Sequence, residues 1–333
     1  MKRKVWCAVA VIAMSLLAGK PQAASAEQLY LIQGSGAGEM TVEQLLASYD
    51  TYSTAGRKLR NDLYLTCLEE QEGFYTEHRD LLTGIRRDRQ AYAVLSEVLN
   101  LAVLEKQREY YECGEALLEI KRRVAAVRKR YGLSVATEER ELWAEETEIA
   151  NGTLEVKRAA EQTTELLRQE ARLGDRSLVL SYLTDWKDYD TEAVLRRFCD
   201  NSEACLQAEY FLSLYREQET GSEGELKEQA EAVEANYVLR EEISREQAEA
   251  YARELLAAYE ETARGLAVAE ERRSVCEEKY DAECRKREYG MATWQSALEC
   301  RAELLQAEAE YLRCLGKKLL LEYALDRGVM SEN

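Results

Sequence analysis

The sequence predicts an all-α protein, an elongated antiparallel coiled-coil bundle made of two duplicated helical-hairpin halves. Its 333 residues contain one proline, Pro21, so the chain after it has none. Because proline breaks helices, and because Glu, Ala, Leu, Arg and Lys dominate the sequence, long helices are expected. The apolar residues form narrow seams at heptad spacing, and only 3 residues are Phe. A seam covers one stripe of a helix, so this pattern favours a rod over a compact globule.

The strongest break in the helical pattern is the stretch 287–293, which reads Arg-Glu-Tyr-Gly-Met-Ala-Thr. The chain after it carries two apolar seams with steps of three and four residues. The first seam consists of Leu298, Ala302, Leu305, Ala309, Leu312, Gly316, Leu319 and Tyr323. The second consists of Ala297, Cys300, Leu304, Ala307, Tyr311, Cys314, Leu321 and Leu325, and only Lys318 interrupts it. Two apolar edges predict two neighbouring helices, so this segment is expected inside a wall of helices.

A second break of the same kind occurs at 130–134, which reads Arg-Tyr-Gly-Leu-Ser. Its Gly132 lies 158 residues before Gly290 (290 minus 132). The seam before it consists of Cys113, Leu117, Ile120, Val124, Val127 and Tyr131, and the seam after it of Leu142, Ile149, Val156 and Thr163. Glycine fits the left-handed backbone position that ends a helix and reverses the chain. Each break therefore predicts the tip of a helical hairpin, and an ordinary helical turn is the alternative for either break alone.

The segments that open the two halves also repeat. A short helix is expected after Thr41, with Thr41 as N-cap and Gln44 in the capping-box position, and a second helix starts near Ser53. The same order returns at Thr191, with a restart at Ser202. Pairs at a constant offset of 149 are Glu43 with Glu192, Leu46 with Leu195, Tyr49 with Phe198, Ser53 with Ser202, and Ala55 with Ala204. The chain is therefore interpreted as an internal duplication, with one helical half at 41–185 and the other at 186–330.

Each half is expected to contain a short helix, two long helices, a tip and a further long helix. Short polar breaks separate the second and third helices, at 73–84 in the first half and 220–224 in the second. The segment 172–189 connects the two halves.

The N-terminus has the features of a secretory signal peptide at 1–26: a basic head, an apolar middle and small residues at the cleavage positions. An uncleaved anchor is the alternative. The stretch 27–40 contains three glycines in alternation and is expected to be a flexible leader. Removal of the signal takes away four basic residues, which gives the mature chain a net charge of 41 minus 63, or −22. Such acidity argues against nucleic acid and anionic membrane surfaces as partners.

No later window of apolar residues is long enough for a membrane span, so none is expected in the mature chain. Export by the Sec route places the mature protein outside the cytoplasm, in the periplasm, the cell envelope or at the cell surface.

The order of elements, with the Tyr-Gly-Leu-Ser and Tyr-Gly-Met-Ala tips, resembles the TolC family of outer-membrane efflux proteins over roughly residues 41–328. The resemblance implies that the two halves form part of a helical tunnel wall and that the chain assembles as a homotrimer. It also implies that the tips dock onto the hairpin of a periplasmic adaptor, or membrane fusion, protein. Two features depart from the family: neither half has the usual proline at the start of its second helix, and polar breaks stand where the family has paired barrel strands. We therefore expect a barrel-less, helix-only relative.

Two functions from different classes follow. The first is a TolC-like extracytoplasmic component of an efflux or export assembly, working as a conduit with an adaptor and its transporter. Its predicted partner-binding residues are Tyr131, Gly132, Leu133, Tyr289, Gly290 and Met291, because an exposed aromatic and an aliphatic beside a chain reversal are unusual in a purely structural turn. The alternative is an extracytoplasmic coiled-coil scaffold with no transport role.

The sequence offers no catalytic, cofactor or metal site, so the protein is not expected to be an enzyme. His78 is the only histidine, and it lies in a polar break where a solvated side chain is the expected state. The glycines at 34–38 lack the lysine of a phosphate-binding loop. Carboxylate pairs such as Glu145 and Glu146 are typical of solvated helix faces in so acidic a chain.

Eight cysteines follow the signal, and export permits disulfides. Cys284 and Cys300 lie on either side of the second tip and face each other in a hairpin centred at residue 292. Cys199 and Cys205 flank the short-to-long helix turn of the second half. Both pairs are candidate disulfides, and reduced cysteines serving as small seam residues are the alternative.

Overall fold

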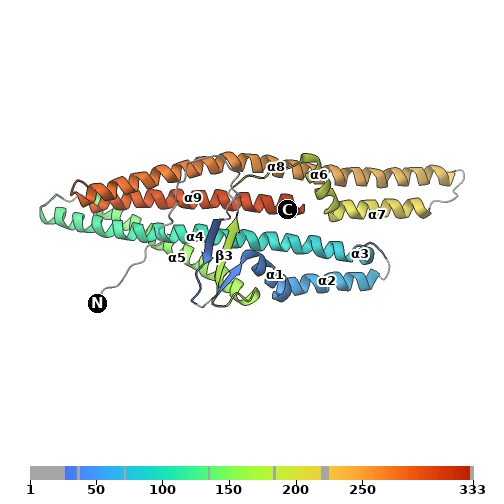
Figure 1. The fold of residues 1–333 in the computed structure, drawn as a ribbon, viewed down its shortest axis with the longest axis horizontal. Coiled ribbons are helices and arrows are strands. Elements are labelled where there is room, and N and C mark those ends of the chain that lie inside the picture. The colour runs from blue at the N-terminus through green and yellow to red at the C-terminus, as the bar shows by residue number, and fades with distance from the viewer. Residues whose placement is uncertain are drawn as a thin grey trace, which may run out of the picture.

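A computed structural model of the chain describes residues 27–35, 38–70, 73–133, 136–182, 185–218 and 225–330. The molecule is an elongated bundle of helices with a small sheet beside its middle (Figure 1). The helices are α1 (Val42–Tyr52), α2 (Thr54–Glu70), α3 (Phe74–Glu77), α4 (Arg79–Arg130), α5 (Ala136–Glu170), α6 (Thr191–Asp200), α7 (Glu203–Gln218), α8 (Glu225–Glu288) and α9 (Trp294–Arg327). The strands are β1 (Glu27–Ile32), β2 (Glu39–Thr41) and β3 (Ser177–Tyr182). The predicted elongated helical bundle with two hairpins is confirmed.

Two predicted segments, the signal peptide at 1–26 and the break at 220–224, lie outside the described residues. None of the described helices combines the length and the apolar composition that a membrane crossing requires.

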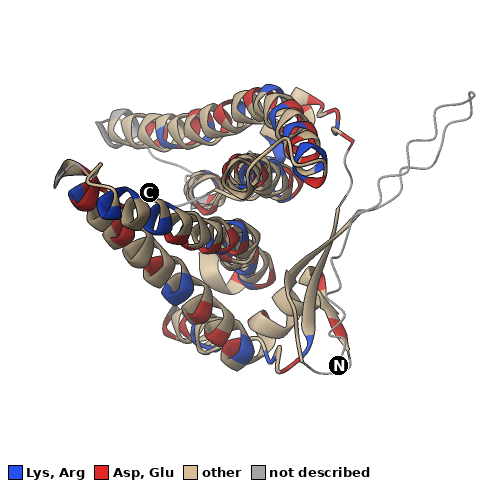
Figure 2. Ribbon diagram, turned by 90° about the vertical axis from the view of Figure 1, so that its left-hand side faces the viewer, with Lys and Arg blue, Asp and Glu red and all other residues tan. Residues whose placement is uncertain are grey.

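The four long helices form a wall in the order α8, α9, α4, α5. Each neighbouring pair is antiparallel, and the two hairpins are α4–α5 and α8–α9 (Figure 1). The seams predicted on the segment after Gly290 explain why α9 lies inside this wall. Leu298 and Leu305 pack on α4 with Cys113 and Leu117, whereas the seam through Leu304, Ala307 and Tyr311 packs on α8. Acidic and basic residues are interspersed along the long helices (Figure 2).

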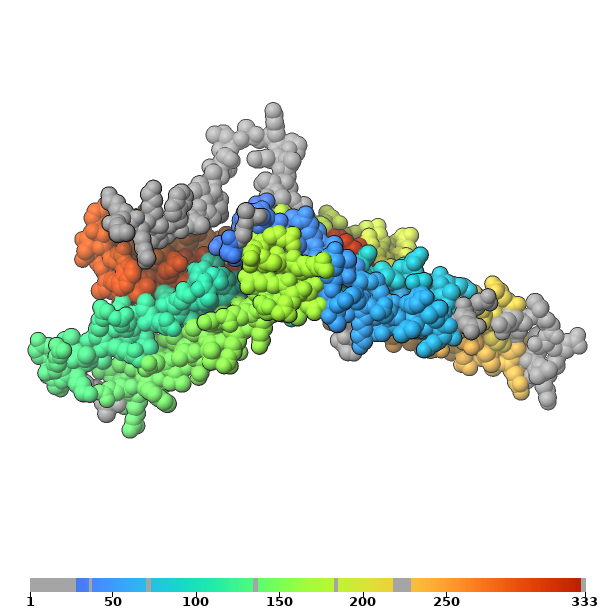
Figure 3. All heavy atoms as spheres, turned by 90° about the horizontal axis from the view of Figure 1, so that it is seen from below, coloured from blue at the N-terminus to red at the C-terminus, as the bar shows by residue number. Residues whose placement is uncertain are grey.

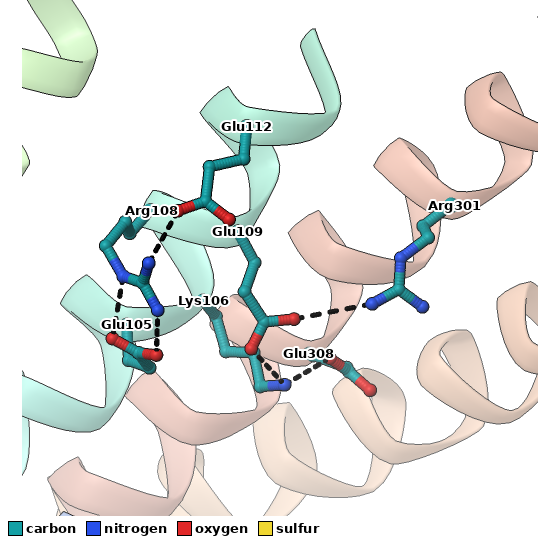
Figure 4. Close-up of polar contacts among 7 residues, drawn as sticks. All are labelled: Glu105, Lys106, Arg108, Glu109, Glu112, Arg301 and Glu308. Atoms are coloured by element: carbon teal, nitrogen blue, oxygen red, sulfur yellow. Dashed lines mark hydrogen bonds and ion pairs between the residues drawn. The ribbon is translucent and has the colours of Figure 1, made fainter. Parts of the chain in front are cut away.

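A network of charged residues reinforces the contact between the two hairpins (Figure 4). Lys106 on α4 lies 3.1 Å from both Glu109 on its own helix and Glu308 on α9. Arg301 on α9 lies 3.5 Å from the same Glu109. The Cys113 thiol also donates to the backbone oxygen of Leu298 at 3.3 Å. The α4–α9 contact therefore combines an apolar seam with interhelical ion pairs, and it fixes the register of one hairpin against the other.

The openings of the two halves share a capping device. At the first, the predicted capping box is present: Gln44 N donates to Thr41 Oγ1 at 3.3 Å, and Thr41 N donates to Gln44 Oε1 at 3.1 Å. Ser53 and Ser202, which are 149 residues apart, are both buried. Their hydroxyls accept from the backbone N–H three residues later, at 2.8 and 3.4 Å respectively. Each serine caps the start of the longer helix that follows it.

The predicted flexible leader is the main departure from the sequence analysis, because 27–32 and 39–41 are strands. They flank β3, which lies in the segment that connects the halves, in a sheet of order β1-β3-β2. β1 is antiparallel and β2 parallel to β3. Gly34, one of the glycines that indicated flexibility, has another role here, since a Cβ at this position would come within 2.1 Å of the Asp175 backbone oxygen. Close backbone approach, which only glycine permits, holds this segment against the connector.

The predicted break at 73–84 is shorter than expected. It ends at His78, and Gly84 lies inside α4. Phe74 is buried at this corner and packs on Tyr210 of α7 with ring centroids 5.7 Å apart. His78 is half-buried and stacks on Phe74 at 4.7 Å, while its Nδ1 lies 3.0 Å from the Phe74 backbone oxygen. The prediction of a fully solvated histidine is wrong, because aromatic packing closes this corner.

Lys318, which interrupts the second seam of α9, fastens the connector to the bundle. Its fully buried Nζ donates to the backbone oxygen of Asp185 at 2.9 Å, lies 3.5 Å from Glu322 and sits 5.0 Å from the centre of the Trp186 ring. The Tyr259 hydroxyl on α8 donates to the same Glu322 carboxylate at 2.8 Å. The lysine thus ties the junction between the two halves to both helices of the second hairpin.

Replacing Lys318 with Met is therefore expected to destabilise the protein strongly. The change leaves the Glu322 carboxylate buried without its cation, a situation that costs about 3 to 5 kcal/mol. Thermal unfolding followed by circular dichroism should show a midpoint lower by several degrees. Lys317→Met, on the exposed face one residue away, is the control and should stay within about 0.5 kcal/mol of wild type. Equal midpoints for the two variants would contradict the role assigned to Lys318.

Candidate functional site: the two hairpin tips

The two chain reversals that the sequence analysis singled out lie at the same end of the rod (Figure 1). Tip 1 is Tyr131, Gly132 and Leu133, between α4 and α5. Tip 2 is Tyr289, Gly290 and Met291, between α8 and α9. The glycines have φ values of 70° and 71°, the left-handed conformation that the sequence predicted for them.

Both tips end their first helix with the same hydrogen bonds. In tip 1, Gly132 N donates to Lys129 O at 3.1 Å and Leu133 N donates to Arg128 O at 2.9 Å. In tip 2 the equivalent bonds run from Gly290 N to Arg287 O at 2.9 Å and from Met291 N to Lys286 O at 2.8 Å. This pair of bonds is the Schellman motif, which satisfies the last carbonyls of a helix. The two tips are therefore copies of one local structure, 158 residues apart.

The side chains at both tips are turned to solvent. Tyr131 and Tyr289 are 76% and 77% exposed, and Leu133 and Met291 are 68% and 72% exposed. A Schellman motif often brings its last residue back onto the helix in an apolar contact, but here the aliphatic side chains stay uncovered. Each tip therefore presents one exposed aromatic and one exposed aliphatic side chain at the same end of the molecule, and these side chains contribute little to the core.

The tips are staggered along the rod. Gln295, at the start of α9, lines a shallow depression together with Lys121, Val124 and Arg128 of α4. Helix α4 continues beyond that level before it reaches Gly132, and at 1.5 Å per residue tip 1 extends on the order of 10 Å further than tip 2. Figure 1 shows the α4–α5 end protruding past the α8–α9 end.

Because of this stagger, the apolar seam of α4 is buried toward the middle of the rod but exposed near tip 1. On α4, Cys113 and Leu117 are buried against α9. The same seam continues about two and three turns after Leu117 as Val124 and Val127, which are 41% and 50% exposed, because α9 begins only at Trp294. Val124 and Val127 of α4 and its C-cap residue Tyr131 therefore form an exposed apolar stripe that begins at the level of tip 2 and runs toward tip 1. We call the recess between this stripe and tip 2 the notch.

Basic residues surround the tips although the chain as a whole is acidic, with a net charge of −18. The last turn of α4 contains Arg128, Lys129 and Arg130, and the last turn of α8 contains Arg285, Lys286 and Arg287. Cations near a helix C-terminus offset the partial negative charge of the helix dipole. Several of them have a further contact: Arg128 and Lys129 pair with Glu138 and Glu139 of α5 at 2.8 and 2.6 Å, and Arg287 lies 4.2 Å over the Trp294 ring. No ion pair of Arg130 or Arg285 occurs within the part of the chain that the structure describes.

The comparisons with known proteins concern this fold. No protein-family model and no curated protein matches the sequence. Among solved structures, a similar one is the channel protein CusC, with a TM-score of 0.54 and 10% identity over 86% of this chain and 94% of that chain. The outer-membrane protein VceC from Vibrio cholerae gives a TM-score of 0.49 and 13% identity, covering 75% of this chain and 71% of that chain. The outer-membrane channel MtrE from Neisseria gonorrhoeae gives 0.47 and 11%, covering 95% and 97%.

The fold of this chain is thus the fold of TolC-family channels, and the resemblance drawn from the paired tips is confirmed at the level of the fold. At such low identity the likeness extends no further than the fold. What the chain does with that fold has to be argued from its own residues.

The candidate disulfide pairs have different surroundings in the structure, where the eight cysteines of the described residues are free thiols. The thiols of Cys199 and Cys205 interact with each other, and burial together with this neighbour raises the pKa of Cys199 to about 11. The Cys284 thiol instead interacts with Tyr280 on its own helix, while burial and the nearby Glu303 and Glu283 carboxylates raise the pKa of Cys300. The structure therefore brings the first pair together, and the Cys284–Cys300 pairing stays a prediction.

Within the described residues no group of three or more His, Cys, Asp or Glu side chains could hold a metal ion.

Alanine at the two tip glycines is expected to destabilise the protein, whereas alanine at two helical glycines should stabilise it. A side chain in the left-handed conformation costs about 1 kcal/mol or more, so Gly132→Ala and Gly290→Ala should lower the thermal midpoint. Gly84 in α4 and Gly265 in α8 have open space around a Cβ and no such φ, so alanine there should add about 0.5 to 1 kcal/mol. Chemical denaturation of the four variants measures these differences, and a stabilised Gly132→Ala protein would show that the tip conformation is misassigned.

For protein exported into an oxidising compartment, we expect a bridge between Cys199 and Cys205. Both residues fall in one tryptic peptide, 198–216, which should be two hydrogens lighter without reductant. The reason is proximity, since a disulfide needs Cα atoms within about 7 Å. Mass spectrometry after alkylation without reductant is the measurement. Full alkylation of both residues would show that the pair stays reduced.

Proposed function

We propose that this chain is a TolC-like, extracytoplasmic component of an efflux or export assembly that docks through its two tips onto an adaptor protein. The observation that supports this most is the repetition of the tips: two copies of one Schellman-capped turn present matching exposed Tyr and aliphatic residues at the same end of the rod. Exposed apolar side chains in such an arrangement mark an interaction surface rather than a structural turn.

In this proposal the chain works by geometry rather than by catalysis. The four-helix wall contributes to a conduit, and the energy for transport comes from the transporter to which the adaptor belongs. A fold shared with CusC, whose structures concern transmembrane channel formation, supports a conduit. The proposed place of action is outside the cytoplasm, in the periplasm, the cell envelope or at the cell surface.

The edges of the wall support self-association. α8 and α5 are its outer helices, and each carries large apolar side chains that are exposed. The exposed residues are Leu239, Ile243, Val268 and Val275 on α8, and Trp143, Leu154 and Leu166 on α5. Figure 3 shows α5 running along one half of a face of the molecule and α1 and α2 along the other half. We propose that copies join edge to edge, in the trimer that the family resemblance implies.

The decisive experiment is a pull-down of the adaptor encoded beside this chain by wild type and by the double variant Leu133→Asp/Met291→Asp. Folding should be unchanged, because substitutions at exposed positions usually cost within about 0.5 kcal/mol. Adaptor capture should fall by at least about tenfold, because burying an unpaired charge in an apolar contact costs on the order of 1 to 3 kcal/mol. Circular dichroism and the thermal midpoint provide the folding control.

Equal capture of the adaptor by wild type and variant would exclude docking through the tips. If no adaptor or transporter is encoded nearby and none co-purifies, the coiled-coil scaffold becomes the better explanation. A variant that unfolds would show that the tip aliphatics belong to the core.

A further inference from the structure

A groove lies where the two halves of the chain meet, in the part of the rod away from the tips (Figure 1). Helices α2 and α4 of the first half and α7 of the second half form its walls, and we call it the junction groove. Its volume is about 1000 Å³. This is the upper end of the range for small-molecule sites, which often lie at the junction of two structural units.

The duplication of the chain explains why this space is open. Ala55 and Ala204, which are equivalent residues 149 positions apart, both line the groove. Each follows by two residues the buried serine that caps its helix, so the starts of α2 and α7 approach the groove in the same way. An alanine side chain ends at Cβ and leaves room beside each helix. Leu59 of α2 and Met330 after α9 add further apolar surface.

The lining of the junction groove has an excess of one positive charge. Lys58, Arg86 and Arg89 line it together with two carboxylates, Asp62 and Glu203, so its net charge is three minus two, or +1. The chain as a whole has a net charge of −18. Glu203 is paired with Arg86 at 2.9 Å, whereas Lys58 and Asp62 form no ion pair among the residues that the structure describes. A ligand with one negative charge would balance this lining, and a second negative charge would meet the two carboxylates.

The same groove contains a hydrogen-bond acceptor without a donor. Gln90 of α4 is half-buried, and its Oε1 is buried with no hydrogen-bond partner in the described part of the chain. A buried acceptor in this state is unfavourable, because it has lost its contact with water and gained none in return. A ligand that brings an N–H or O–H group to Gln90 would satisfy it.

We propose that the junction groove binds a small organic molecule with one negative charge, an apolar body and a hydrogen-bond donor. Its anionic group lies beside Lys58 and the guanidinium groups of α4, and its donor reaches Gln90 Oε1. Its apolar body lies over Ala55 and Ala204. Such a ligand contacts both halves of the chain and stabilises the position of α7 beside α4. The inference is independent of docking through the tips, which lie at the other end of the rod (Figure 1).

The test uses a pair of fluorescent probes that differ in one group. The anion 8-anilino-1-naphthalenesulfonate has a single negative charge, aromatic rings and an N–H group, and its emission rises in an apolar site. N-phenyl-1-naphthylamine has the same rings and the same N–H group but no sulfonate. Titration of the full chain should show saturable binding of the anion, about three- to fivefold tighter than binding of the neutral probe, in the range of one exposed ion pair.

A variant that fills the groove tests the location of both probes. Ala204 is exposed, so Ala204→Phe should fold normally, and circular dichroism checks this. The phenyl ring takes the space of the apolar body and should weaken binding of both probes at least about tenfold. Ala250→Phe, at an exposed alanine of α8 that lies outside the groove, is the matched control and should change binding less than about twofold.

Two further variants test the polar contacts separately. Lys58→Glu changes the net charge of the lining from +1 to −1. It should weaken binding of the anion about three- to tenfold and leave the neutral probe within about twofold. Lys317→Glu, on the exposed face of α9, is the charge control. Gln90→Leu should weaken binding of both probes to the same extent, because both carry the N–H group.

The outcomes decide each part of the proposal. Binding of the anion that Ala204→Phe leaves unchanged would place the probe elsewhere and overturn the site. If Ala204→Phe fails to fold, Ala55→Phe on the opposite wall gives the same measurement. Equal affinity of wild type for the two probes, or equal loss of both in Lys58→Glu, would overturn the anionic ligand. Loss of adaptor binding in the tip variants with intact probe binding would leave this inference standing, which separates it from the proposed function.

Discussion

The contact between α4 and α9 is the constraint on which the rest of this structure depends. These are the inner helices of the wall, and each belongs to a different hairpin. Their shared seam buries Cys113, Leu117, Leu298 and Leu305, and the pairs around Lys106 and Glu109 surround it with charge. Exposed ion pairs contribute little to stability, so the apolar seam provides the energy and the charged residues fix the register. A slip by one heptad would separate Lys106 from Glu308 and would change the distance between the two tips.

The register has a direct consequence for the surface at the end of the rod. Because Cys113 lies opposite Leu298, near the start of α9, α4 continues for several turns beyond the level at which α9 begins. The stagger between the tips is thus not a property of either tip. Two local structures that are nearly identical in their hydrogen bonds are placed at different heights by a contact far below them, and the height difference creates the notch.

Much of this arrangement could be predicted from the sequence, and the reasons are local. The two apolar edges of α9 predicted its inner position, and the glycines at 132 and 290 predicted the left-handed caps, because heptad spacing and a positive φ leave direct traces in sequence.

The sheet could not be predicted in this way. Gly34 is required by the nearby backbone of Asp175, a contact across more than a hundred residues, and from the sequence alone it is indistinguishable from a flexible glycine. In the sequence, Lys318 is recognisable only as an interruption of an apolar seam. In the structure it donates to a backbone oxygen of the connector, and no pattern of residue types specifies such a contact. The stagger was likewise missed, because the sequence gives the centre of each hairpin but not the register between hairpins.

The two tips also differ in what holds them in place. Near tip 2, α8 and α9 are joined by buried Cys276, Leu304 and Ala307. Beyond the level of tip 2, no described side chain from Glu119 to Ile149 is buried, and α4 and α5 are joined there mainly by ion pairs such as Lys121–Glu145 and Lys129–Glu139. Such pairs are weak and are screened by salt, so this projecting part of the first hairpin is weakly stabilised. A partner that docks at the tips and covers the exposed Val124 and Val127 would provide the apolar contact that this part lacks. Docking and ordering of the first hairpin would then be coupled, and part of the binding free energy would be used to stabilise the hairpin itself.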